Sequence, residues 1–117
     1  MVKLENKKGI ISISSDVFTN IAGETASRCF GVKGMAGKSK ESGIYQLLRK
    51  ESMSKGVFVT FNEDETISVA LHIIVDNGVN LKALGESIIG EVSYKVSEAT
   101  GVPVKCVDVF IDAVTID

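Results

Sequence analysis

A loop rich in glycine, GVKGMAGKSK at residues 31–40, is the stretch of this 117-residue sequence that most resembles a phosphate-binding site. A P-loop needs Gly, four residues and then Gly-Lys-Ser/Thr, because its backbone N–H groups and its lysine converge on the phosphates. Gly37, Lys38 and Ser39 supply the end of that pattern, but Val32 stands where the first glycine is required. The loop also follows an expected helix, whereas a P-loop follows a strand and opens a helix. The sequence therefore argues against nucleotide binding.

Basic residues around this loop suggest a second chemistry, the binding of RNA or another polyanion. Residues 31–34, GVKG, match the GxxG that clamps a nucleic-acid backbone in KH domains, but that tetrapeptide joins two helices and this one joins a helix to an expected strand. Base stacking has little support, since Phe30 and Tyr45 are the aromatic residues nearby. Nucleic acid is thus an unlikely partner. The candidate residues for binding a partner or an anion are Lys33, Lys38, Lys40, Arg49, Lys50 and Lys55.

Residues suited to catalysis or metal binding are few and widely spaced. His72 is the one histidine, and Cys29 and Cys106 form no CxxC pair. A zinc site needs several ligands at recognisable spacing. Asp108 and Asp112 would lie roughly 13 Å apart along a strand, too far for a pair of catalytic carboxylates. The sequence therefore predicts no catalytic, cofactor-binding or metal-binding residues, and we expect the protein not to be an enzyme.

Length and charge narrow the class of protein further. The length suits one domain over residues 1–117. No apolar run approaches the roughly 20 residues of a membrane span or forms a signal sequence, so a cytoplasmic protein with reduced thiols is expected. The net charge is −2, but residues 1–55 carry +5 and residues 56–117 carry −7. If the fold keeps these parts separate, each offers a charged docking surface; if it mixes them, neither does.

Apolar periodicity predicts the elements that position these residues. Alternation of apolar and polar residues indicates strands, and spacing of three and four residues indicates helices. Gly31 and Gly101 stand where glycine commonly ends a helix. Strands are expected at residues 9–14, 32–36, 57–61, 66–75 and 104–115, and helices at 17–29 and 81–99.

Residues 36–56 are the least hydrophobic segment and are expected to form a mobile excursion. The spacing of Ile44, Leu47 and Leu48 predicts a short helix near its end. The element order is then β-α-β-(α)-β-β-α-β, which predicts an α+β two-layer sandwich, a small mixed sheet with two long helices on one face. The long helix should connect residues 66–75 to residues 104–115 as two parallel strands.

Two motifs carry a resemblance to a known family. Gly-Val-x-Gly-Met stands at residues 31–35, and Arg-Lys-x-x-x-x-Lys-Gly-Val stands at residues 49–57. With the surrounding segments, over roughly residues 9–115, the chain resembles the alkaline shock proteins, small envelope-stress proteins of Gram-positive bacteria, and within them the short cytoplasmic branch. It departs from the usual pattern in Gly85 and Gly90 of the long helix, and in an Asp-Asn pair before Gly78 where an aromatic residue is more usual.

The resemblance implies a role without catalysis or cofactor, in the response to envelope or alkaline stress. It also implies a protein partner, either a small membrane protein or a second copy of the chain, and membrane association through that partner. We therefore expect a non-enzymatic interaction or scaffold protein. Two alternatives stay open: RNA or polyanion binding through residues 33–55, and a regulatory subunit of a neighbouring metabolic enzyme.

Overall fold

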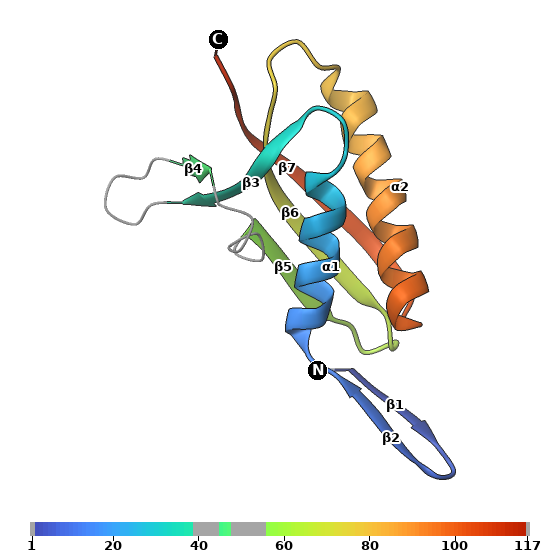
Figure 1. Ribbon diagram of the computed structural model, residues 1–117. Coiled ribbons are helices and arrows are strands. Elements are labelled where there is room, and N and C mark those ends of the chain that lie inside the picture. Colours follow the sequence, from blue (N-terminus) through green and yellow to red (C-terminus); the bar gives the residue numbers. More distant parts are fainter. Residues whose placement is uncertain (1, 39–44, 48–55, 117) are drawn as a thin grey trace.

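The computed structural model describes residues 2–38, 45–47 and 56–116. They form a five-stranded mixed sheet with two helices on one face, and a separate two-stranded hairpin (Figure 1). The predicted α+β fold, with its helices on one side of a mixed sheet, is confirmed. The elements are β1 (Val2–Asn6), β2 (Gly9–Ile13), α1 (Ser15–Ser27), β3 (Val32–Lys38), β4 (Tyr45–Leu47), β5 (Val57–Phe61), β6 (Ile67–Val75), α2 (Leu81–Thr100) and β7 (Val104–Val114).

The central strand of the sheet is β6, which has neighbours on both sides. Along one side it pairs in parallel with β7, as the helical crossover through α2 predicts. Along the other side β5 pairs with residues 67–71 and β3 pairs with residues 73–75, both antiparallel. β4 extends the sheet beyond β3. This order leaves β7 on the outside of the described sheet.

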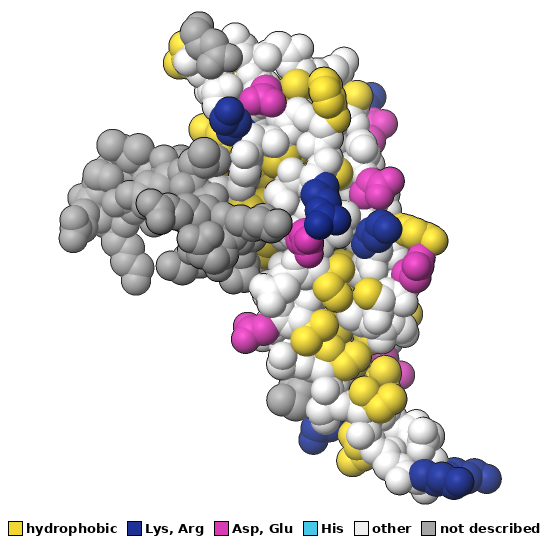
Figure 2. All heavy atoms as spheres, in the orientation of Figure 1, with side chains coloured by type: hydrophobic (Ala, Val, Ile, Leu, Met, Phe, Trp, Pro, Cys, Tyr) yellow, Lys and Arg dark blue, Asp and Glu magenta, His cyan; other side chains and the backbone are white. Residues whose placement is uncertain are grey.

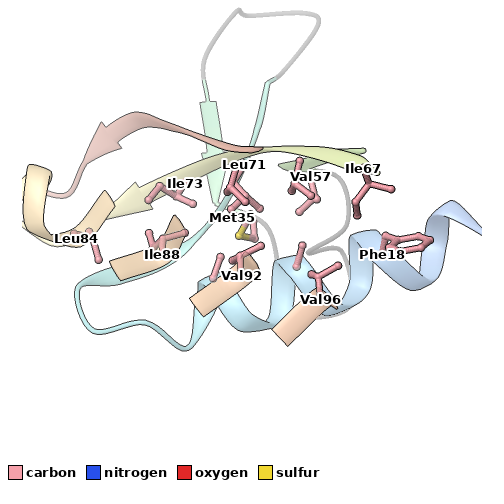
Figure 3. Close-up of a cluster of buried hydrophobic side chains, with 14 of the residues drawn as sticks. Phe18, Met35, Val57, Ile67, Leu71, Ile73, Leu84, Ile88, Val92 and Val96 are labelled. Carbon is pink, nitrogen blue, oxygen red and sulfur yellow. The ribbon is translucent and has the colours of Figure 1, made fainter. Parts of the chain in front are cut away.

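The hydrophobic core lies between the sheet and the two helices (Figure 3). Alternate residues of β6 face the helices because successive side chains of a strand point to opposite faces. The apolar stripe of α2 repeats every four residues and faces the same layer. Fully buried side chains that join the layers are Phe18 from α1, Met35 from β3, Leu71 and Ile73 from β6, and Ile88 and Val92 from α2. Each such side chain stabilises the fold by about 1.5–3 kcal/mol.

The N-terminal hairpin is not among the elements that the sequence predicts. The sequence predicts residues 9–14 as the first strand of the mixed sheet, and this placement is wrong. β2 pairs instead with β1, from Val2↔Ile13 to Asn6↔Gly9, and the hairpin projects away from the sheet (Figure 1). The turn is closed locally, since the backbone N–H of Lys8 donates to Oδ1 of Asn6 at 2.8 Å. β1 carries only two apolar residues among charged ones, so its alternation is too short to indicate a strand.

The predicted short helix near residues 44–48 is wrong in the part that the structure describes. Tyr45–Leu47 forms β4, which pairs antiparallel with residues 36–38 at the end of β3. Three apolar residues give too short a pattern to separate a helical turn from a strand, and pairing with β3 decides between them. Ile44 and Leu48 lie outside the described residues, as does most of the predicted excursion over residues 36–56.

Gly56 precedes β5 at a point where two other strands come close. A Cβ at this position would lie 2.9 Å from the carbonyl oxygen of Ala36 and 3.0 Å from that of His72. Because both contacts are with backbone, we expect Gly56→Ala to lower the free energy of unfolding by about 1–3 kcal/mol. Urea unfolding followed by circular dichroism measures this, with Gly9→Ala as the control, since no atom lies within 4 Å of a Cβ there. Equal unfolding midpoints for the two variants would contradict the packing described.

Candidate interaction surface

The predicted basic site is only partly covered by the described residues. Lys33 is exposed at the irregularity in β3, between Val32 and Gly34, where the pairing with β6 shifts register. Lys38 is the last residue of β3. Whether these two lie together with the other four stays a prediction, because the structure does not describe Lys40, Arg49, Lys50 and Lys55.

The glycine-rich loop forms the turn from α1 into β3. Gly31 has a φ of +96°, a left-handed conformation that favours glycine. Its carbonyl oxygen accepts a hydrogen bond from the backbone N–H of Asp76 at 2.8 Å, which ties the turn to the end of β6. A Cβ on Gly31 would also lie 2.9 Å from Cγ1 of Val79. The loop therefore has a structural role in joining the helix to the sheet.

An aromatic cluster occupies the face of the sheet opposite the helices, called here the open face. The ring of His72 stacks on Phe110 at 4.7 Å between centroids and 11° between planes, and lies edge-on to Phe58 at 5.6 Å and 87°. Nδ1 of His72 is 2.9 Å from Oδ2 of Asp112. Phe58 and Phe110 are nevertheless 59% and 46% exposed, respectively. The cluster thus presents apolar rings to solvent in a fixed arrangement.

The histidine and aspartate of this cluster could form part of a catalytic set only with a nucleophile nearby. Cys106 lies four residues before Phe110, the register partner of His72, and so roughly 13 Å away along the strand. Cys29 lies beyond α1, where its thiol donates to the carbonyl of Thr25. Neither thiol therefore completes a Cys–His pair. Within the part of the chain that is described, no three His, Cys, Asp or Glu side chains are grouped to hold a metal ion.

Carboxylates border the rings of the open face along β7. Asp108 is exposed two residues before Phe110, and Asp112 follows two residues after it. The side chain of Asp112 is largely buried and contacts His72. A partner on this surface would therefore meet aromatic rings beside negative charge.

The outer edge of β7 borders a second apolar surface. In the described chain β7 pairs only with β6, and a groove of about 420 Å³ separates its outer side from α2. Leu81 and Ile89 line the groove from α2 and are 43% and 41% exposed, with Gly85 between them. Leu81 faces this groove and is not part of the buried stripe of α2. Residues 107–111 line the opposite side.

The two thiols are expected to differ in reactivity. Cys29 lines a groove between α1 and α2, where burial raises the pKa of its thiol and the negative charge of Glu91 raises it further. Cys106 is exposed. Iodoacetamide at pH 8 should therefore alkylate Cys106 first, because the thiolate is the reacting form. Mass spectrometry of the two peptides measures both rates.

A control for this prediction is Glu91→Gln, which should lower the pKa of Cys29 and speed its alkylation without affecting Cys106. Because the folded-state pKa of Cys29 is raised above its ordinary value of 9.0, its contribution to stability is present below that pH and is lost as the pH rises through the folded pKa. Faster alkylation of Cys29 than of Cys106 would contradict its burial.

Known proteins share this fold and place the chain in a family. Residues 3–116 match the alkaline shock protein family, which is described as having a cell envelope-related function. The chain therefore belongs to the alkaline shock protein family, and the predicted resemblance is confirmed. Neither described helix combines the length and apolar character that crossing a membrane requires.

Two bacterial relatives match almost the whole chain. The chain is 34% identical over 116 residues to the uncharacterized protein YloU of Bacillus subtilis (strain 168), covering 98% of this chain and 96% of that protein. It is likewise 34% identical over 116 residues to the uncharacterized protein Spy1614 of Streptococcus pyogenes serotype M6, covering 98% and 95%. The solved structure of MamM-CTD 215-293 has a TM-score of 0.51 at 16% identity, covering 86% of this chain and 99% of that one. At this identity the likeness to the solved structure concerns the fold alone.

Proposed function

We propose that this protein is a non-enzymatic interaction protein that acts in the envelope or alkaline stress response by binding a protein partner on the open face of its sheet. The observation that carries the proposal is the exposure of Phe58 and Phe110 on a face that neither described helix covers. Aromatic side chains are enriched in protein–protein interfaces and dominate their binding energy. The envelope-related description of the family supports the cellular setting.

The arrangement of the cluster supports binding because its rings are held in place before a partner arrives. His72 stacks on one phenylalanine and meets the other edge-on, and its hydrogen bond to Asp112 fixes the orientation of the imidazole. Ordering flexible side chains on association costs about 0.5–1.5 kcal/mol for each one. A preorganised cluster avoids part of this cost.

The charge of the open face indicates the chemistry of the partner surface. The rings lie beside the carboxylates of Asp108 and Asp112. A lysine or arginine on the partner would gain both from these carboxylates and from the aromatic faces, which attract cations. We infer a partner surface that combines apolar side chains with a basic residue, carried by an envelope protein that brings this chain to the membrane.

The proposal is tested by cross-linking in cells that naturally make the protein, followed by affinity purification of the tagged full chain after alkaline shift. The expected result is one envelope protein recovered in near-stoichiometric amount and unaffected by nuclease. Recovery that disappears with nuclease would favour the RNA alternative through residues 33–55. A tagged chain that stays monomeric and retains no protein above the untagged background would contradict the proposal.

A further inference from the structure

We propose that the outer edge of β7 accepts an extended peptide segment of the partner as an added strand, in the groove between β7 and α2. This inference rests on the proposed function and deepens it, because it names the mode of binding and the chemistry of the bound segment. An added strand on a sheet edge gains affinity from main-chain hydrogen bonds and specificity from alternate side chains.

The backbone of β7 meets the first requirement, a regular edge without a partner. Its parallel pairing with β6 runs without interruption from Cys106 to Ile111, between two irregularities of register. Backbone groups of a strand point to both sides, and in the described chain no strand pairs with the outer side of β7. The N–H and C=O groups on that side are therefore available to an extended backbone.

The facing surface of α2 meets the second requirement, an apolar wall at strand distance. Leu81, Gly85 and Ile89 follow one another at four-residue spacing, so they form one row along the helix. Both large side chains of this row are substantially exposed. Glycine is a poor helix former, and no atom lies within 4 Å of a Cβ at Gly85, so packing inside the chain does not explain it. The missing side chain leaves space for side chains of an added strand.

The size of the groove and the charge beside it favour a peptide strand as the occupant. A volume of about 420 Å³ is typical of a site for a small ligand or short peptide. On the helix side of this edge Glu86 and Lys82 offset each other, while on the other side the exposed carboxylate of Asp108 would lie beside an added strand. The segment should therefore alternate apolar residues with polar ones that include a lysine or arginine.

The experiment uses the ¹⁵N-labelled full chain and a capped nine-residue peptide that alternates valine and lysine as the probe. The amides of residues 106–111 and 81–89 are expected to shift on titration, with a peptide that alternates valine and glutamate binding more weakly. Gly85→Leu should weaken binding of the lysine peptide at least tenfold, because it fills the groove. Gly90→Leu is the matched control: it removes the other open glycine of α2, which lines a different surface, and should bind like wild type.

Both leucine variants should melt no lower than wild type, because leucine is the better helix former, so loss of folding does not complicate the comparison. No shift of β7 amides at millimolar peptide, or equal binding by the two variants, would overturn the inference. Purification of the two variants from native cells distinguishes failure of this inference from failure of the proposed function. If Gly85→Leu retains the native partner as well as Gly90→Leu does, the edge is not the binding site although the proposed function stands.

Discussion

Phe18→Ala is expected to lower the free energy of unfolding by about 3–5 kcal/mol, the range for removing a large aromatic side chain from a core. Phe18 is fully buried near the start of α1, and its ring meets Phe61 of β5 edge-on at 5.8 Å between centroids. The substitution would leave a cavity at the contact that holds α1 against the sheet (Figure 3). Urea unfolding followed by far-ultraviolet circular dichroism measures the change.

The matched control for this prediction is Phe30→Ala, which makes the same chemical change at a side chain that is 93% exposed. Its effect should stay within about 0.5 kcal/mol. If both substitutions destabilise the protein equally, Phe18 does not lie in the core and the placement of α1 is wrong.

The double variant Phe58→Ser with Phe110→Ser is expected to reduce recovery of the native partner at least tenfold. Aromatic residues at the centre of an interface commonly contribute about 2 kcal/mol or more each, and about 1.4 kcal/mol corresponds to a factor of ten. The substitutions should affect stability much less than Phe18→Ala, since both rings are largely solvent-exposed. Quantitative mass spectrometry of cross-linked, affinity-purified material measures the recovery.

Phe30→Ser serves as the control for partner binding, because it removes an exposed ring that lies outside the open-face cluster. Recovery similar to wild type is expected from this variant. If the double variant retains the partner as well as Phe30→Ser does, the open face is not the binding surface.

The main sheet and its helices could be predicted because their patterns are long. β6 alternates over nine residues and α2 keeps one apolar stripe over twenty, so each pattern fits one element type. The helix between them also indicates that β6 and β7 are parallel neighbours. Two shorter elements were not predicted. Tyr45–Leu47 has too few residues to distinguish a strand from a helix. β1 has only two apolar residues, and it forms a strand by pairing with β2 across a local turn.

The aromatic cluster could not be predicted because it depends on strand register. Phe58, His72 and Phe110 come from three strands, and alternation alone shows only which face each one takes. They meet because Phe110 is the parallel register partner of His72, and because Phe58 lies opposite Ala70, which is two residues before His72 on the same face of β6. No pattern within a single strand carries that information.

The charge asymmetry of the sequence does not become two separate surfaces in the described chain. β3, from the basic part, pairs with β6, from the acidic part, and α1 packs beside α2 (Figure 1). Basic and acidic side chains consequently alternate over the helical face (Figure 2). Among the described residues, Lys and Arg side chains gather in this view at the tip of the N-terminal hairpin, where Lys7 and Lys8 form the turn.

Photo-cross-linking from the open face tests most directly whether this surface binds a partner protein. A photoreactive benzoyl-phenylalanine is introduced in place of Phe58, and separately in place of Phe30, in the full chain inside native cells. We predict an adduct with a single envelope protein from position 58 and none from position 30. An adduct from position 30 alone, or the same adducts from both positions, would contradict the account.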